Sequence, residues 1–559
     1  MTGVTGHDDL IALADEYWDA VMEANPSTAT LLGDHRFDDH IEDLSVEAQD
    51  TLKSRWRDLL GRVEALPADG LDATDRVTRS LLCVELVRAI DDLDHRLTEL
   101  WSDQMDGVHA GLLMTAPEVS APTPESAGAL VARYRQVGRL LDQAADRFRS
   151  GLGAGRTPAR VVIERSLNQV DGYLASDLGD DPFLAIGGPE GWDGEPAWRE
   201  ALADAIRESI RPGFQRYRDV LANELLPMAR PDERCGLSWL GSDGVGLYRT
   251  FIAKHTTLDD LSAEQVHHIG LAEVERLAGE YAEVGGRLFG TSDLAEVFAR
   301  LRDDKALRYA TGDEIVADNE RYMADATAVM GDWFGRLPEG ACAIKEVPDF
   351  LAPDAPAGYY FPPAVDGSRP GAYFVNTYEP TERPRTETAS IAYHEAIPGH
   401  HLQLAIANEL THLPLFQRQS QGNTAFAEGW ALYAERLADE MGLYRDDIER
   451  LGMLAGDSWR SCRLVVDTGL HALGWSRQQA IDYVLANAPV GEDLVAVEVD
   501  RYIAIPGQAL SYKVGQLEIQ RLRAEAQQAQ GDAFDIRAFH DAVLGSGTVS
   551  LPVLRELVG

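Results

Sequence analysis

Cysteine and lysine are scarce in this sequence, and long apolar runs are missing. None of the four cysteines forms a C-x-x-C pair, which argues against a disulfide framework and against a cysteine-ligated zinc. We therefore predict a reducing, cytoplasmic setting. No run approaches the roughly 18 apolar residues of a membrane span. The opening MTGVTGHDDL lacks the basic and apolar regions of a signal peptide, so we expect neither a membrane partner nor export.

The phosphate-binding motifs of nucleotide enzymes are absent as well. None of the five lysines completes a G-x-x-x-x-G-K-[ST] loop, and no G-x-S-x-G elbow occurs. The nearest approach to G-x-G-x-x-G is GLGAG at 151–155, where Arg156 stands in place of the third glycine. The formal charge of −41, from 51 basic and 92 acidic residues, argues against a nucleic-acid or anionic-membrane partner.

A globular and mainly helical pattern is what the sequence does contain. Of its 559 residues, 45% are hydrophobic and 26% are charged, which is the balance of a globular protein with a large core. Apolar residues recur at spacings of three and four over long segments, as is typical of amphipathic helices. The clearest of these segments are 10–24, 77–101, 127–149 and 196–229.

Strand signal is confined to AIKEV at 343–347 and AYFVNTY at 372–378, within a proline-rich stretch. Glycine, proline and aspartate interrupt the helical pattern at 228–246. We therefore predict a mainly α fold in two halves, with a small β element ahead of the motif described next. The first half is 1–230 and the second, which carries the chemistry, is 231–559, either as two domains or as one continuous domain.

A cluster of histidines follows the predicted strands: His394-Glu395-Ala-Ile-Pro-Gly-His400-His401. It opens like the zinc motif H-E-x-x-H, in which two histidines at i and i+4 share one helix face and bind zinc while the glutamate activates water. Here the second histidine falls at i+6 or i+7. On a regular helix the residue at i+6 lies about 240° round and about 9 Å along, which is too far for both imidazoles to bind one ion.

The proline and glycine inside this motif offer a way to restore the geometry. Proline removes a backbone donor and glycine permits unusual dihedral angles, so a bulge at Ile397–Pro398 would extrude two residues and return His400 to the face of His394. His401, at i+7, is the alternative ligand, and a helix that breaks at the proline and folds back favours it. A histidine-rich helix end without metal is the third interpretation.

A third ligand is available 28 residues beyond His400, in the segment TAFAEGWALYAE. We predict a helix here with Glu428 and Glu435 on one face. Glu428 follows an apolar run, so we expect it to be buried, and a buried glutamate is rare unless it is paired or metal-bound. The sequence therefore predicts a Zn²⁺ site formed by His394, His400 and Glu428. The alternative role of Glu428 is a helix-start carboxylate favoured by the helix dipole, and Glu435 is either a supporting or a surface residue.

Four motifs in this order, YHEAIPGHHLQ, FAEGWALYAE, VDTGLH and PGQALSYKVGQ, resemble the bacterial family called domain of unknown function 885. That family is similar to the helical zinc peptidases of the thimet oligopeptidase, angiotensin-converting enzyme and Taq-type carboxypeptidase group. The resemblance runs from about Gly236 to the C-terminus. It implies a zincin-like fold whose helical halves enclose a deep cleft that admits only short peptides. Dipeptidyl peptidase III resembles an intermediate case, with one residue inserted at the same place and zinc retained.

The resemblance also implies roles for residues outside the histidine cluster. In the related peptidases a strand before the zinc helix pairs with the substrate backbone. This assigns 372–378, and Asn376 in it, to substrate binding unless the segment is an ordinary edge strand. A tyrosine beyond the zinc helices bonds the tetrahedral oxyanion, and Tyr512 occupies that position here. Lys513 is either a receptor for a substrate carboxylate or a surface charge.

Further candidates for substrate binding come from the predicted helix 444–473 and from the histidine motif. Arg463, Asp467 and His471 share one helix face at i, i+4 and i+8. Arg463 and His471 could contact substrate, with Asp467 orienting the imidazole; the alternative is a buried ion pair on a packed helix. His401 is a candidate for substrate binding if it does not bind metal.

The pattern as a whole predicts a zinc metallopeptidase that hydrolyses short peptides. The zinc leaves one position for water, Glu395 takes the proton of that water and returns it to the leaving amine, and Tyr512 bonds the oxyanion. The alternatives are a non-catalytic binding protein on a decayed zincin fold, and a zinc hydrolase of non-peptide amides or esters. The preferred side chains, the choice between endo- and exopeptidase, and the oligomeric state stay open.

Overall fold

Helices make up most of the computed structural model, which describes residues 4–67, 70–348, 352–353, 355–363, 369–420 and 422–558. The predicted mainly α fold with a small β element is confirmed. The helices of the first part of the chain are α1 (Val4–Ala24), α2 (Pro26–Leu31), α3 (Val46–Glu64), α4 (Ala73–Asp94), α5 (Val108–Thr115), α6 (Pro124–Tyr134), α7 (Val137–Gly153), α8 (Arg160–Ala175), α9 (Glu195–Ala205) and α10 (Arg211–Val220).

Fourteen more helices follow among the described residues. They are α11 (Ser242–Thr256), α12 (Ala263–Phe289), α13 (Leu294–Asp303), α14 (Gly312–Trp333), α15 (Thr388–Glu395), α16 (His400–Glu409), α17 (Leu415–Gln419), α18 (Thr424–Glu440), α19 (Asp447–His471), α20 (Arg477–Asn487), α21 (Glu492–Ala504), α22 (Ser511–Gln530), α23 (Ile536–Leu544) and α24 (Leu551–Val558). Many begin at a polar cap: the side chains of Ser262 and Asp446 accept hydrogen bonds from first-turn N–H groups of α12 and α19.

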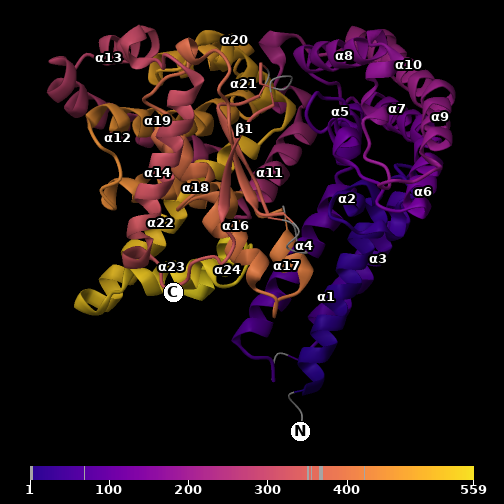
Figure 1. The fold of residues 1–559 in the computed structure, drawn as a ribbon, viewed down its shortest axis with the longest axis horizontal. Coiled ribbons are helices and arrows are strands. Elements are labelled where there is room, and N and C mark those ends of the chain that lie inside the picture. Colours follow the sequence, from indigo (N-terminus) through magenta and orange to yellow (C-terminus); the bar gives the residue numbers. More distant parts are fainter. Residues whose placement is uncertain are drawn as a thin grey trace.

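The hydrophobic cores divide the chain differently from the predicted halves 1–230 and 231–559. Apolar residues of α1, α3 and α4, such as Trp56 and Leu82, belong to the same core as Tyr393 and Trp430 of the second half. The helices α6 to α10 enclose a separate core. In Figure 1 the indigo helices α1 and α3 descend beside the C-terminal part, and α6 to α10 lie beyond them at the upper right.

Polar contacts also join the first helices to the second half. Thr78 of α4 donates a hydrogen bond of 2.8 Å to the side chain of Gln417. Arg88, ten residues further along α4, donates at 3.0 Å to Asn423, the residue that precedes α18. The start of α18 is therefore held from both halves of the sequence.

A three-stranded sheet lies between the helices of the second half. Its order is β1 (Cys342–Glu346), β3 (Gly371–Val375), β2 (Gly358–Phe361), with β1 parallel and β2 antiparallel to β3. The strands β1 and β3 fall at the two predicted segments, whereas β2 was not predicted. The central strand β3 is almost wholly buried, and β1 and β2 are the outer strands of the sheet.

All four cysteines are free. No helix of the described chain combines the length and the apolar character needed to cross a membrane.

Candidate metal centre

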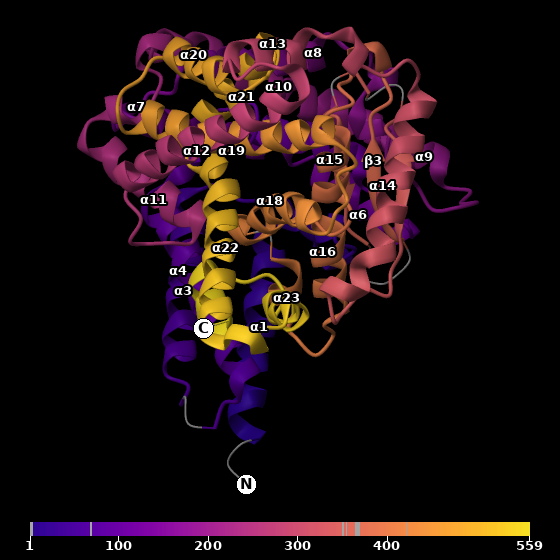
Figure 2. The ribbon, with the colours of Figure 1, turned by 90° about the vertical axis from the view of Figure 1, so that its left-hand side faces the viewer.

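The histidine motif interrupts a helix that the sequence predicts to run over 386–409. The helix α15 ends at Glu395, α16 begins at His400, and the N–H of His401 donates to the carbonyl of Ala396 at 3.0 Å across the break. The chain there is packed too tightly for any side chain at Gly399, because a Cβ atom would lie 1.9 Å from the carbonyl oxygen of His394. In Figure 2 the helix α15 lies above α16.

Trp430 supports the turn between α15 and α16. Its indole ring is fully buried and its Nε1–H donates to the carbonyl of Pro398 at 2.9 Å. Trp430 lies on α18, two residues after Glu428, so the helix that carries the acidic candidate ligand also supports the turn between the two histidines.

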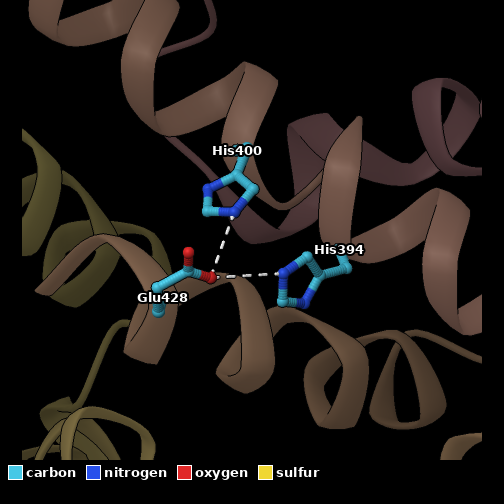
Figure 3. Close-up of side chains that lie close together, drawn as sticks. All are labelled: His394, His400 and Glu428. Carbon is cyan, nitrogen blue, oxygen red and sulfur yellow. Dashed lines mark ion pairs between the residues drawn. The ribbon is translucent and has the colours of Figure 1, made fainter. Parts of the chain in front are cut away.

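His394, His400 and Glu428 point toward one another (Figure 3). The Oε2 atom of Glu428 lies 3.5 Å from Nε2 of His394 and 3.4 Å from Nε2 of His400. In a tetrahedral zinc site with bonds of roughly 2.0–2.1 Å, neighbouring ligand atoms are about 3.3–3.4 Å apart. The separations thus suit three ligands of one ion. This buried oxygen forms no hydrogen bond of normal geometry within the described chain.

A second carboxylate stands behind the first histidine. The Nδ1 atom of His394 lies 2.8 Å from Oε1 of Glu435. Glu435 is 2% exposed and follows Glu428 by seven residues, on the same face of α18. With its proton on Nδ1 and shared with Glu435, the imidazole presents Nε2 as a lone-pair donor toward the cluster. Of the two roles left open for Glu435, the supporting one agrees with this contact.

The electrostatics of the cluster favour a cation. Burial lowers the pKa of His394, but the contacts with Glu428 and Glu435 outweigh burial and raise that pKa to about 9. Burial opposes ionisation of Glu428 too, yet His394 and His400 hold its pKa well below the usual range. Positive charge at this place is therefore stabilised by surrounding carboxylates. Two imidazole nitrogens and one carboxylate oxygen are a donor set that fits Zn²⁺ with one coordination position left over.

Glu395 follows His394 directly and faces the open space beside the cluster. Burial raises the pKa of its carboxyl, and the nearby imidazoles of His394 and His400 offset part of that rise. No hydrogen bond from any described residue occupies this carboxylate. It is therefore a free proton acceptor beside the candidate metal position.

Tyr512 reaches the same space from α22. The helices α18 and α22 approach at two glycines: a Cβ atom on Gly429 would lie 2.4 Å from Cα of Gly515, and one on Gly515 only 1.8 Å from the carbonyl of Ala425. Figure 2 shows the two helices crossing steeply. This close crossing brings Tyr512 near Glu428. Burial, and then the charge of Glu428, raise the pKa of the Tyr512 phenol.

The cluster opens into a cavity of about 1460 Å³. His394, Glu395, His400, Glu428 and Tyr512 all line it. Its walls come from α13 to α16, β2, β3, α18, α19, α21 and α22, so the described residues around it lie between positions 301 and 548. The cavity therefore lies within the segment 231–559, the one predicted to carry the chemistry.

The substrate-binding role predicted for Asn376 and the strand 372–378 is not supported by their surroundings. Asn376 is 1% exposed, and its Nδ2 donates to three carbonyl groups of the preceding loop, those of Ala352, Ala355 and Pro356. The strand β3 is paired on both sides. Both the side chain and the backbone edges of β3 are thus already occupied, and the outer strands of the sheet are β1 and β2.

Lys513 is a structural cation and not a surface charge or a receptor in the cavity. Its ammonium is fully buried and lies 2.6 Å from Oδ1 of Asp457 and 2.9 Å from Oε2 of Glu273. It therefore joins α22 to α19 and α12. The sequence reading failed because both partners lie far away along the chain.

Two predicted histidine contacts are also structural. His401 is 3% exposed and turns toward the sheet, where Nδ1 meets the hydroxyl of Tyr360 at 2.9 Å. His471 accepts from the N–H of Leu237 and donates to the carbonyl of Tyr502. The predicted pairing of His471 with Asp467 does not form, since that carboxylate bonds elsewhere.

Arg463 does line the cavity, together with Arg460 one turn earlier on α19. The guanidinium of Arg463 lies over the ring of Tyr512, 4.6 Å from its centroid. Arg460 and Trp430 were both missed by sequence reasoning. The spacing of Arg460 and Arg463 at i and i+3 on one helix face was the available signal for the first, and the tryptophan within FAEGW was the signal for the second.

The fold has close relatives among solved structures. One, described as "the putative lipoprotein from Colwellia psychrerythraea", is 27% identical with a TM-score of 0.89 and covers 99% of this chain and 98% of its own. Another, described as "a putative lipoprotein of unknown function from Shewanella oneidensis", is 19% identical with a TM-score of 0.77 and covers 98% of each chain. No curated protein matches. A family model described as "Bacterial protein of unknown function (DUF885)" matches residues 26–558, so the chain belongs to that family.

Proposed function

We propose that this protein is a zinc-dependent hydrolase of short peptides. The observation that carries the proposal is the arrangement of His394, His400 and Glu428 around one point, with Glu435 behind the first histidine and Glu395 beside it. The likeness to the helical zinc peptidases is part of the proposal, and so are the zinc ion and the peptide substrate.

The side chains would divide the chemistry between them. A bound zinc would acidify a water molecule and polarise the carbonyl to be attacked. Glu395 would accept the proton of the attacking water and pass it to the leaving amine, because its carboxylate is unoccupied and its pKa is raised. Tyr512 would donate its phenolic hydrogen to the oxyanion, and no described residue bonds that hydroxyl.

The shape of the cavity supports a peptide of a few residues. A volume of about 1460 Å³ exceeds the roughly 300–1,000 Å³ of ordinary small-molecule pockets. Gly358, Tyr359 and Tyr360 of the outer strand β2 line it, so the free edge of that strand could pair with an extended substrate backbone.

The test combines metal analysis with hydrolysis. Purified protein reconstituted with zinc is dialysed, analysed for metal, and incubated with a mixture of short peptides that is followed by mass spectrometry. We expect about one zinc per chain and peptide cleavage that a chelator abolishes. Zinc binding with hydrolysis of amide or ester probes only would replace the peptide substrate by a non-peptide one. Absence of zinc after reconstitution would overturn the enzyme and leave a binding protein.

The predicted cytoplasmic location remains part of the proposal as well. The description of the two solved relatives as lipoproteins applies to those proteins. Fractionation of the source cells, with an antibody against this chain, decides between a cytoplasmic and an exported protein.

A further inference from the structure

Two arginines on one face of α19 project into the cavity with unused hydrogen-bond donors. Arg463 is 4% exposed; its Nε donates to the hydroxyl of Tyr502 at 2.9 Å and its Nη2 to Glu498 at 3.1 Å, while its buried Nη1 has no partner. Arg460 donates from Nη1 to the carbonyl of Gly456 at 3.3 Å, and its buried Nε has no partner. A buried guanidinium with free N–H groups is costly unless something completes its bonding.

The two arginines form few direct ion pairs with described residues. Glu498 is the carboxylate that pairs with Arg463, and it also pairs with Arg501 at 2.8 Å. Arg460 forms no ion pair with any described residue. Glu387 and Glu395 of the same cavity act on Arg460 only through their charge and form no direct bond with it. The free donors of the two arginines are therefore available to an anionic group that enters the cavity.

The arginines lie beside the candidate metal centre. A Cβ atom placed on Gly456 would be 2.9 Å from Oε2 of Glu435 and 3.1 Å from Nη1 of Arg460, so these two groups flank the same point of α19. The guanidinium of Arg463 lies over the ring of Tyr512. An anionic group held by the arginines would therefore be close to the bond that the centre would cleave.

We propose that Arg460 and Arg463 bind the C-terminal carboxylate of the substrate, so that the enzyme removes residues from the C-terminal end of short peptides. This inference rests on the proposed function. A peptide carboxylate is planar and anionic, and it accepts two parallel N–H donors from a guanidinium. A peptide has one such group at a fixed distance from its last amide bond, and this geometry selects the end of a chain over its middle.

The test compares one tetrapeptide in three forms: with free ends, with an amidated C-terminus, and with an acetylated N-terminus. For the zinc-loaded protein we expect amidation to lower kcat/KM by about 10- to 100-fold, the effect of charge-assisted hydrogen bonds. Acetylation should change it little. Arg460→Gln should bring the ratio of free to amidated peptide close to one, and Arg460→Lys should restore part of it. Arg383→Gln is the matched control and should keep the ratio, since Arg383 lines another wall of the cavity and forms no ion pair with any described residue.

Binding measurements keep the outcome independent of turnover. Calorimetry on Glu395→Gln protein should show tighter binding of the free peptide than of the amidated one, and Glu395→Gln/Arg460→Gln protein should lose that preference. Equal cleavage and equal binding of free and amidated peptide, with zinc present, would overturn the inference and leave the proposed hydrolase intact. A loss on acetylation instead would overturn it in favour of amine recognition, for which Glu387 of the same cavity is a candidate. Carboxylate-dependent binding without zinc uptake or cleavage would support the arginine site and overturn the hydrolase.

Discussion

Glu395 and Glu428 line the same cavity, yet their pKa values are shifted in opposite directions. Burial raises the pKa of Glu395, and its carboxylate meets no donor from the described chain. Glu428 is held by two imidazoles, and its pKa is well below the usual range although burial opposes this. A group that binds and releases a proton is thus placed beside one that stays ionised, which is the division a base and a metal ligand require.

The first residue-scale prediction concerns Glu395. Glu395→Gln should retain zinc and lose about 10²- to 10⁴-fold in kcat, because the ligands stay while the proton acceptor is removed. Zinc content by elemental analysis and peptide turnover are measured on the same sample. Substantial activity in this variant would show that another group activates the water.

The second prediction separates the adjacent histidines. His400→Ala should weaken zinc binding by more than the about 10- to 100-fold typical of losing a supporting residue, because a ligand disappears. His401→Ala should keep zinc but lower stability by about 1–3 kcal/mol, since Tyr360 loses its buried partner. Chelator competition and urea unfolding of both variants check this. Equal zinc affinity in the two variants would contradict the assignment of His400.

At the scale of helices, two glycines govern the position of Tyr512. The crossing of α18 and α22 at Gly429 and Gly515 is close enough to exclude any side chain. Lys513 and Gln516, the neighbours of Tyr512 on α22, then bond Asp457 and the carbonyl of Leu432. Tyr512 is therefore positioned by backbone contact and by a buried ion pair, and not by bonds of its own hydroxyl.

A substitution at this crossing tests the dependence of Tyr512 on helix position. Gly515→Ala should destabilise the protein by about 1–3 kcal/mol through overpacking, and should lower kcat by more than the fraction unfolded explains. Gly279→Ala on α12 is the control, because no atom lies within 4 Å of its added methyl group and a gain of about 0.5–1 kcal/mol is expected. If Gly515→Ala keeps full turnover in its folded fraction, the crossing does not position the tyrosine.

At the scale of the whole molecule, the candidate centre belongs to one of several cores. The helices α15 and α18 share their core with α1, α3 and α4, whereas α6 to α10 have their own. A ligand stabilises the parts of a protein that form its site, by about 2.7 kcal/mol at a concentration 100 times its Kd. Its effect should therefore be uneven along the chain.

Removal of the metal should change amide hydrogen exchange in some helices and not in others. Zinc should slow amide hydrogen exchange in α15, α16 and α18 and leave α6 and α7 unchanged, and a chelator should reverse the effect. Exchange followed by mass spectrometry of peptic fragments is the measurement, with His400→Ala as the control. Protection spread equally over α6 and α7 would indicate a single cooperative unit instead.

The sequence contained enough to predict the helical class, two of three strands, and the cluster of His394, His400 and Glu428, because these depend on local pattern and short spacing. It failed for Asn376, Lys513 and His471. Each of these looks available in the sequence but is consumed by partners that only tertiary structure brings near, such as Asp457 and Glu273 around Lys513. The outer strand β2 escaped notice because four residues are too few to show alternation.

The hydrogen bonds from α4 to the segment ahead of α18 limit how this centre could be transferred to another protein. Thr78 and Arg88 donate hydrogen bonds to Gln417 and Asn423, and Trp56 and Leu82 belong to the same core as Trp430. Grafting or recombining the chain at position 230 would separate the metal helices from the surface on which they rest. The candidate centre therefore depends on the first hundred residues of the chain and cannot be transferred without them.

A fragment of 231–559 expressed alone should be insoluble, and co-expression with 1–230 should restore its solubility.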